Sequence, residues 1–312
     1  MGQFDQADLM RELEPVVGVE LDRHLGVARE WFPHGYVPWS QGEDFDGPLG
    51  GRGWDEGQSR LSEVARTALV VNLLTEDNLP SYHREIYRVF GRDGAWGTWV
   101  GRWTAEEGRH GIAIRDYLLT TRAVDPVALE RERMAHMSAG YEGANELDML
   151  HTVAYVTFQE LATRISHRNT GRYTQDPVAD ALLTRIATDE NLHMVFYRNL
   201  LAGALQVAPS PTVQAVWDVV RDFQMPGAGM AGFARRSVQI AMAGIYDLRI
   251  HRDEVLAPVL KHWRLWDIEG LDGPAEQARE QLAAFLDRLE VTASAFEDRR
   301  ARLQARRVAL AD

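Results

Sequence analysis

The sequence contains no cysteine. This absence excludes disulfide bonds, cysteine-ligated zinc and iron–sulfur clusters, because each of them is built on cysteine sulfur. It is also typical of proteins that work in a reducing compartment. The first residues, MGQFDQADLM, are acidic and include no apolar core, so they do not resemble a secretory signal peptide. These features predict a cytoplasmic location.

Long apolar runs and lysine are also scarce. No stretch approaches the roughly 18–20 consecutive apolar residues of a membrane-spanning helix, so no membrane span is expected. Lys261 is the only lysine, and arginine supplies nearly all of the positive charge. Codon bias in a GC-rich genome explains this better than selection of arginine for bidentate contacts. The formal net charge of −12 argues against a nucleic-acid partner.

Helical periodicity, by contrast, runs through most of the chain, and no segment alternates with the two-residue period of a strand. Residues 31–54 are rich in glycine, proline and aromatics and are predicted to be irregular. The glycine-rich pieces GPLGGRG and PGAGMAG do not follow a strand, which favours plain loops over phosphate-binding loops. Helices are predicted over residues 9–25, 59–78, 95–122, 125–137, 146–169, 176–205, 233–245, 252–266 and 274–308.

The sequence Glu-x-x-His occurs twice, as Glu107 with His110 and as Glu190 with His193. A single match does not indicate a metal site, because roughly one is expected by chance in a chain of this composition. Here, however, each match follows another glutamate on a different predicted helix. Glu76 lies about thirty residues before Glu107, and Glu160 lies about thirty residues before Glu190.

Glutamate and histidine three residues apart lie on one face of a helix and can bind one metal centre together. The two repeats supply four carboxylates and two imidazoles from four helices, the ligand set of a carboxylate-bridged di-iron or di-manganese site. Each glutamate alone is more simply a solvated or capping residue. Bulky apolar neighbours surround all four, and burying an unpaired carboxylate costs several kcal/mol. A dinuclear metal site removes that cost.

An acidic residue precedes each repeated glutamate, as Glu106 and Asp189. Histidines that bind a metal usually donate their other N–H to a carboxylate. The pseudo-twofold repeat therefore predicts that Asp189 orients His110 and that Glu106 orients His193.

The predicted fold class is all-α: a ferritin-like di-iron four-helix bundle core with additional packing helices. The bundle core is expected over about 59–205 and a C-terminal helical extension over about 274–312. Residues 1–312 are expected to form a single domain of this type.

Several long segments resemble the signature segments of soluble acyl-acyl-carrier-protein desaturases, most closely those of the actinobacterial branch. They are WFPHGYVPWSQGEDF (31–45), TEDNLPSYHREI (75–86), RWTAEEGRHGIAIRDYL (102–118), FQELATRISHRNTG (158–171) and DENLHMVFYRNL (189–200). The resemblance covers most of residues 10–265 and includes all six candidate ligands: Glu76, Glu107, His110, Glu160, Glu190 and His193.

The resemblance also implies roles beside the metals. Thr163 matches a threonine proposed to lie by the oxygen-binding face, although a helical threonine also bonds its own backbone. Trp31 matches a tryptophan on an electron route that passes through Asp189 and His110, although core packing explains a tryptophan as well. His167 matches a histidine near the site that is not a ligand. Asp77 falls where plant members often have a second glutamate.

The implied activity is oxidative. Two iron ions per chain would use O₂ to remove hydrogen from adjacent methylenes of a fatty acyl chain carried on acyl carrier protein. The implied electron donor is ferredoxin, and the implied assembly is a homodimer. Since the carrier is acidic, a local basic patch should receive it, with Arg235, Arg236, Arg249 and Arg252 as candidates against ordinary surface charge. The run at 297–307 is predicted to be a solvated or interface helix.

Other classes remain open at this stage. A di-iron hydroxylase on the same scaffold, a metal-storage protein and a non-catalytic protein that binds a metal or an acyl carrier would all keep these ligands. A radical-generating small subunit usually has an aspartate ligand, and the all-glutamate set argues against it. Membrane desaturases have histidine boxes and spans, which this chain lacks. Iron or manganese, chain length, double-bond position, tunnel lining and reductant are likewise undecided.

Overall fold

A computed structural model describes residues 5–140 and 148–309. Within those residues the regular structure is helical, apart from one isolated bridge between Phe45 and Arg52. This confirms the all-α prediction. Residues 1–4, 146–147 and 310–312 of the predicted domain and helices lie outside the described part. The α-helices are α1 (Gln6–Val27), α2 (Glu63–Asp77), α3 (Leu79–Phe90), α4 (Gly94–Thr120), α5 (Pro126–Ala139), α6 (Met149–Thr174), α7 (Pro177–Val207), α8 (Pro209–Arg221), α9 (Phe233–Met242), α10 (Leu248–Ile250), α11 (Ala257–His262) and α12 (Gly273–Ala309).

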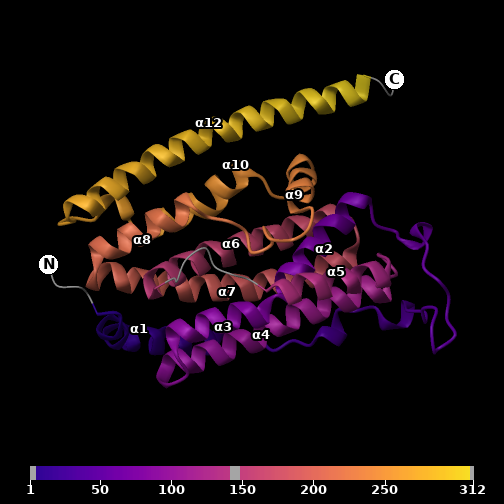
Figure 1. Ribbon diagram of the computed structural model, residues 1–312, viewed down its shortest axis with the longest axis horizontal. Helices are drawn as coiled ribbons and strands as arrows, with labels where there is room; N and C mark the ends of the chain where they lie inside the picture. The colour runs from indigo at the N-terminus through magenta and orange to yellow at the C-terminus, as the bar shows by residue number, and fades with distance from the viewer. Residues whose placement is uncertain (1–4, 141–147, 310–312) are drawn as a thin grey trace.

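The centre of the molecule is a bundle of α2, α4, α6 and α7, in which α6 packs along α7, α2 packs on α4 and α6, and α4 contacts α7. The other helices cover this bundle. α1 packs against α7 and α4, α3 against α4 and α6, and α5 and α9 against α2. α12 reaches the body through α8 and α10 and runs along one side of the molecule (Figure 1).

The helices begin where the sequence supplies N-terminal caps. Asp125 and Asp176 each accept hydrogen bonds from two backbone N–H groups of the first turn, and a proline follows each of them in the first helical position. A cap satisfies backbone donors that have no partner inside the helix. Asp5, Ser62 and Asp148 cap their helices in the same way.

Two helices were not predicted, α3 and α8, and both begin at a proline-containing first turn. Pro80 does not kink a continuous helix. It lies in the first turn of α3, just after α2 has ended at Asp77. The segment predicted as one helix over 252–266 is also different. The helix begins earlier, at Leu248 in α10, passes through a π-helical stretch at His251–Leu256 and ends with α11 at His262, and a short 3₁₀ turn follows at Leu265–Asp267.

The irregular segment between α1 and α2 is held by Arg122, which is buried at the end of α4. Its guanidinium donates hydrogen bonds to the side chain of Gln58 and to the backbone carbonyls of Glu43, Asp44, Arg52 and Gly53. These bonds fix the path of the irregular backbone. As predicted, residues 31–54 are irregular, with short 3₁₀ turns at Pro33–Gly35 and Trp39–Gln41 and the isolated bridge between Phe45 and Arg52.

Two apolar clusters fill the bundle, one on each side of its polar middle. On α4, Trp99 and Trp103 belong to one cluster, while Ile114 and Leu118 belong to the other. The residues between them along α4 include Glu106, Glu107 and His110, which are all buried. The same order holds on α7, where Ile186 and Phe196 flank the second repeat. The fold therefore places the polar repeats between two blocks of core.

None of the helices in the described ranges is both long enough and apolar enough to cross a membrane.

Candidate metal centre

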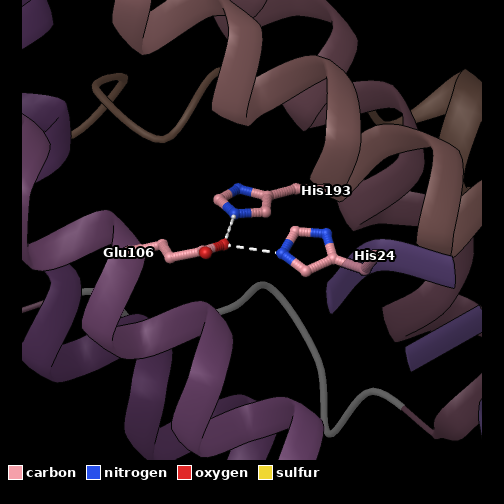
Figure 2. A group of neighbouring side chains, drawn as sticks. All are labelled: His24, Glu106 and His193. Atoms are coloured by element: carbon pink, nitrogen blue, oxygen red, sulfur yellow. Dashed lines mark hydrogen bonds and ion pairs between the residues drawn. The ribbon is translucent and has the colours of Figure 1, made fainter. Parts of the chain in front are cut away.

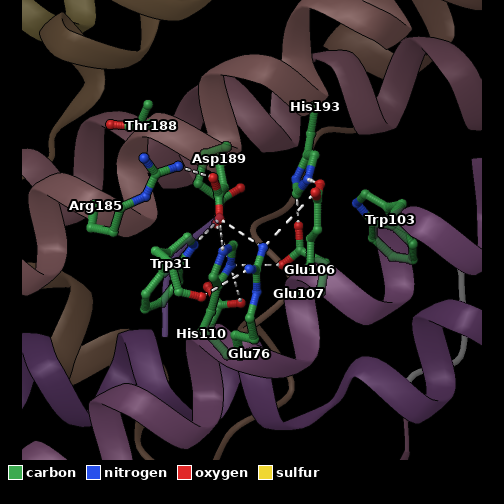
Figure 3. Close-up of polar contacts among 12 residues, drawn as sticks. Trp31, Glu76, Trp103, Glu106, Glu107, His110, Arg185, Thr188, Asp189 and His193 are labelled. Atoms are coloured by element: carbon green, nitrogen blue, oxygen red, sulfur yellow. Dashed lines mark hydrogen bonds and ion pairs between the residues drawn. The ribbon is translucent and has the colours of Figure 1, made fainter. Parts of the chain in front are cut away.

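The six candidate ligands converge from the four bundle helices. Glu76 lies in the last turn of α2, Glu160 lies on α6, and the two Glu-x-x-His pairs lie on α4 and α7. All six are buried, and Glu160, His110 and His193 have no exposed surface. Figure 3 shows carboxylates and imidazoles from both repeats pointing toward one another in the interior of the bundle.

Ligand atoms from these residues form two groups, and within each group the atoms lie within 4.8 Å of one another. One group is Glu76, Glu107, His110 and Glu190, and the other is Glu107, Glu160, Glu190 and His193. We call them the Glu76–His110 subsite and the Glu160–His193 subsite. Glu107 and Glu190 belong to both. This is the arrangement expected of two metal ions that share two carboxylates.

Each imidazole presents Nδ1 to the carboxylates. His193 Nδ1 lies 2.7 Å from Glu107 Oε1 and 3.6 Å from Glu160 Oε2. His110 Nδ1 lies 3.1 Å from Glu107 Oε2 and 3.3 Å from Glu190 Oε1. In both rings Nε2 points away, toward the acid that directly precedes the Glu-x-x-His sequence of the opposite repeat. We call these residues, Glu106 and Asp189, the outer acids. One nitrogen of each ring is thus directed at a metal position, and the other is available for orientation.

Several of these atoms have no hydrogen-bond partner. Glu107 Oε1, Glu160 Oε2, Glu190 Oε1 and His193 Nδ1 are buried and make no hydrogen bond with any described residue. His193 Nδ1 is close to Glu107 Oε1, but the two are not aligned as a hydrogen bond. Buried polar atoms are almost always satisfied. The unpartnered atoms face one shared space, so the residues present fit a pair of metal ions.

The electrostatics of the centre also call for cations. Burial and the neighbouring Glu190 and Glu107 raise the pKa of Glu160 well above its usual value. Burial lowers the pKa of His193, but its contacts with three carboxylates outweigh this and raise the pKa well above the ordinary value. Without metal ions, the excess negative charge in this buried space is therefore relieved by binding protons. Two divalent cations would relieve it in the same way.

On the Glu76–His110 side, Asp189 is the outer acid. Its Oδ2 lies 3.5 Å from His110 Nε2, and it accepts a hydrogen bond of 2.6 Å from Trp31 Nε1 (Figure 3). Arg109 lies 3.3 Å from the same oxygen, and Arg185 pairs with Oδ1. Burial raises the pKa of Asp189, but the hydrogen bond from His110 and the other donors lower it to about 2. Asp189 is therefore a carboxylate anion at neutral pH.

Trp31 is buried and lies nearly parallel to His110, with 6.3 Å between ring centroids. The guanidinium of Arg109 covers the Trp31 ring at 5.0 Å. The predicted series Trp31, Asp189 and His110 is thus a chain of direct contacts that starts at the irregular segment and ends at a candidate ligand.

On the Glu160–His193 side, Glu106 is the outer acid, and its Oε2 lies 2.9 Å from His193 Nε2. The same oxygen lies 2.9 Å from Nε2 of His24, a residue of α1 that the sequence reasoning missed (Figure 2). Arg102 pairs with the other oxygen of Glu106. Burial raises the pKa of Glu106, but hydrogen bonds with His193 and His24 lower it far below the usual range. No signal pointed to His24, because it lies outside the repeat.

Three more polar contacts surround the ligands. The Thr163 hydroxyl lies 3.1 Å from Glu190 Oε2, and it also bonds the backbone carbonyls of Gln159 and Glu160. His167 Nε2 lies 3.0 Å from Glu76 Oε1. Trp103 donates a hydrogen bond of 2.9 Å to Glu160 Oε1. Thr163 is thus placed both for its backbone bond and for a role beside the ligands.

Two cavities reach the candidate ligands, and Glu76 lines both of them. The α3 cavity is lined by Glu76, Glu107 and apolar residues of α3, α4 and α6. The α9 cavity is lined by Glu76, Thr163, His167 and apolar side chains that include Phe233 and Ile240. Met225, Ser237 and Tyr246 also line a third, more open cavity beside α10 and α12.

The four candidate docking arginines differ in their surroundings. Arg249 pairs with Glu290 and Glu297 of α12, and Arg252 pairs with Asp253 and Glu290. Arg236 lies 2.5 Å from Glu132 of α5. These three arginines are tied to acids and join helices to one another. Arg235 alone among the four is exposed on α9.

Comparison with known proteins gives a consistent result. A family model described as fatty acid desaturase matches residues 5–311. The chain is 51% identical over 296 residues to DesA1 of Mycobacterium tuberculosis, which bears the name of an acyl-acyl-carrier-protein desaturase; the match covers 93% of this chain and 87% of that protein. It is 30% identical over 266 residues to stearoyl-acyl-carrier-protein 9-desaturase 6 of Arabidopsis thaliana, covering 80% and 68%.

A solved structure shows the same fold. The X-ray structure of DesA2 from Mycobacterium tuberculosis, titled as an acyl-ACP desaturase, superposes with a TM-score of 0.71 at 33% sequence identity. The match covers 87% of this chain and 99% of that one.

Proposed function

Because the chain belongs to the fatty acid desaturase family, we propose that it is an acyl-acyl-carrier-protein desaturase with two iron ions bound between α2, α4, α6 and α7. The enzyme class, an oxidoreductase, follows from the family. The observation that carries the finer proposal is the pair of four-residue subsites that share Glu107 and Glu190.

In this proposal Glu107 and Glu190 would contribute to holding both metals. Glu76 and His110 would hold one of them, and Glu160 and His193 would hold the other. Carboxylate and imidazole ligands suit iron and also manganese, and iron is proposed because the reaction uses O₂. When bound, the ions supply the redox centre at which O₂ oxidises the acyl chain.

The net reaction removes two hydrogens from adjacent methylenes, consumes O₂, two electrons and two protons, and yields one carbon–carbon double bond and two waters. The α3 and α9 cavities support this assignment, because both bring apolar walls to Glu76. An extended acyl chain lying through them would pass beside the metals. Ile86, Val89 and Val156 on one side and Phe233 and Ile240 on the other would exclude water from it.

The proposed electron route enters through Trp31. The Trp31 indole contacts Asp189, which contacts His110, so the route needs no step through solvent. The proposed electron donor is ferredoxin. Thr163 is proposed to act from the Glu190 side, where its hydroxyl faces the space between the two subsites. Asp189 and Trp31 are thus proposed for electron supply and Thr163 for oxygen handling.

The proposed carrier of the substrate is acyl carrier protein, and the proposed assembly is a homodimer in the cytoplasm. Arg249, Arg252 and Arg236 each pair with an acid of this chain, which makes them weaker candidates for the dock. Arg235 remains the candidate, beside the α9 cavity.

The test is mass spectrometry of the acyl group after iron-loaded protein has been incubated with long-chain acyl carrier protein, O₂ and reduced ferredoxin. The expected result is a loss of two hydrogens, with fragmentation giving the position of the double bond. Gain of one oxygen would instead identify a hydroxylase. An unchanged chain, in protein shown to hold two irons, would contradict the proposal and favour a non-catalytic metal or carrier protein. The Glu190→Ala variant is the matched control for background oxidation.

A further inference from the structure

His24 is the one histidine near the metal centre that belongs to none of the four ligand helices. It lies in the last turn of α1, and it has no exposed surface. Figure 2 shows its ring meeting the same carboxylate as His193, from another side. His24 is buried and lines none of the cavities described above. Burying an imidazole costs free energy unless it is paired, so its contact with Glu106 points to a role beyond packing.

The contact is specific to one oxygen. Glu106 Oε2 lies 2.9 Å from His24 Nε2 and 2.9 Å from His193 Nε2. The other oxygen of Glu106 pairs with Arg102, and a carboxylate paired in this way accepts hydrogen bonds. Both rings must therefore carry a proton on Nε2. In the neutral form of His193 this leaves Nδ1 bare, and Nδ1 is the nitrogen that faces Glu107 and Glu160.

Two arginines contact the other oxygen of Glu106 and compete with His24 in setting the orientation of the carboxylate. The other oxygen of Glu106 pairs with Arg102, whose side chain is 40% exposed, and lies 3.9 Å from Arg109. Both arginines are long and flexible, so they do not fix the rotation of the carboxylate by themselves. The His24 ring is packed edge-on against Trp99 at 5.0 Å and stacked on His193 at 5.7 Å. It is therefore a rigid donor.

The opposite subsite is held by other groups. There, Asp189 is held by the Trp31 indole and by two guanidinium groups, and it lies 3.5 Å from His110. His24 contacts neither Asp189 nor His110. Any effect of His24 on metal binding should therefore fall on the Glu160–His193 subsite alone.

We propose that His24 is a positioning residue for the Glu160–His193 subsite: it fixes the orientation of Glu106, and through Glu106 it fixes the tautomer in which His193 presents Nδ1 to a metal. The inference rests on the proposed dinuclear site, but it requires no acyl substrate. α1 thereby becomes part of the metal centre without supplying a ligand.

The test is an anaerobic titration of the metal-free full-length protein with Fe²⁺, followed by metal analysis, for wild type and three variants. His24→Phe keeps the volume of the ring and removes the donor. His24→Gln keeps an N–H donor near the position of Nε2. His251→Phe removes another largely enclosed imidazole, which contacts Tyr246 and no candidate ligand, and is the matched control.

The expected result is a loss of affinity for one Fe²⁺ of the two, by about 10–100-fold, in His24→Phe, as is typical when the partner of a metal-binding histidine is removed. The other Fe²⁺ should bind as in wild type. His24→Gln should recover most of the loss, and His251→Phe should leave both affinities unchanged.

Two equivalents bound by His24→Phe with wild-type affinity, or equal weakening of both, would overturn the inference. A third equivalent in wild type that disappears in His24→Phe would also overturn it, because His24 would then be a ligand itself. No Fe²⁺ bound by wild type would instead refute the proposed metal centre.

A measurement on wild type alone covers the case in which His24→Phe does not fold. Nitrogen-15 NMR of the zinc-loaded protein reports which ring nitrogen carries the proton. His24 and His193 should both be protonated on Nε2. A proton on Nδ1 of either ring would contradict the proposal.

Discussion

The two repeats supply matching ligands, but the surroundings of those ligands differ. The acid behind His110 is Asp189, which contacts an indole and two guanidinium groups and leads toward the irregular segment at Trp31. The acid behind His193 is Glu106, which contacts a fully buried imidazole of α1. The Asp189 side is thus linked to the irregular segment, and the Glu106 side is fixed by a buried ring of α1. A symmetric ligand set can therefore serve two unequal metal positions.

Glu107 and Glu190 belong to both subsites, so a variant of either one tests what the two subsites share. Glu190→Ala removes a ligand from both subsites at once, so we expect loss of both metals and of all measurable activity. Metal analysis and the acyl mass-spectrometry assay check this. The control is Glu280→Ala, which changes an exposed glutamate of α12. Two metals retained by Glu190→Ala would show that the subsites do not share this carboxylate.

The Asp189 side is tested by Asp189→Asn, which keeps the shape of the side chain and removes its charge. We expect metal content to remain near wild type and turnover to fall about 10–100-fold, because an amide holds His110 less well than a carboxylate does.

Trp31→Phe should slow reduction of the metals by the donor more than it changes metal content. Stopped-flow reduction and metal analysis separate the two effects. An unchanged reduction rate in Trp31→Phe would remove Trp31 from the electron route.

Arg109 is the residue that links the two sides. Its Nη2 lies 3.3 Å from Asp189 Oδ2 and 3.9 Å from Glu106 Oε1, and its Nη1 donates to the Trp31 carbonyl. Arg109→Gln should therefore produce a small effect on both, about two- to fivefold in each metal affinity, because other donors remain on each acid. Iron titration measures it. An effect confined to one metal would show that the sides are independent.

His251 is a largely enclosed imidazole without a carboxylate partner among the described residues. It therefore tests the premise that a carboxylate partner changes the pKa of a buried imidazole. Its neighbour is the Tyr246 hydroxyl at 2.9 Å, and burial lowers its pKa to about 4. The folded state therefore binds the proton less readily than the unfolded state does. Stability should fall as pH drops from about 6.5 toward 4, by at most about 3 kcal/mol from this residue.

Urea unfolding of wild type and His251→Gln at pH 7 and pH 4.5 measures the effect. The variant should lose less stability than wild type between the two pH values. Equal losses would mean that His251 does not control this part of the pH dependence.

The sequence predicted that these six side chains come together, because a repeated motif carries its own internal check. Glu-x-x-His twice, each with an earlier glutamate, leaves little room for coincidence, and the structure brings all six side chains together. The same reasoning could not find His24, since a single histidine on an amphipathic helix has no partner in the pattern. Nor did it find α3 and α8, whose first turns contain prolines that also occur in loops.

The partners of the candidate docking arginines could not be predicted either. Arg249 and Arg252 look free in sequence, but α12 folds back and places Glu290 beside both of them. Charge is a property of one residue, whereas neutralisation depends on residues about forty positions away. No local pattern contains that information.

By itself, the sequence determined the helical class, the four ligand helices and the chemistry of the six donors, because each follows from periodicity and from residue type at short spacing. Only the tertiary structure decided that α1 brings His24 to Glu106 and where the apolar cavities meet the candidate ligands. These are contacts between segments as far apart as His24 and His193. They exist only once helices pack, because packing alone sets the distance between groups that the chain does not connect locally.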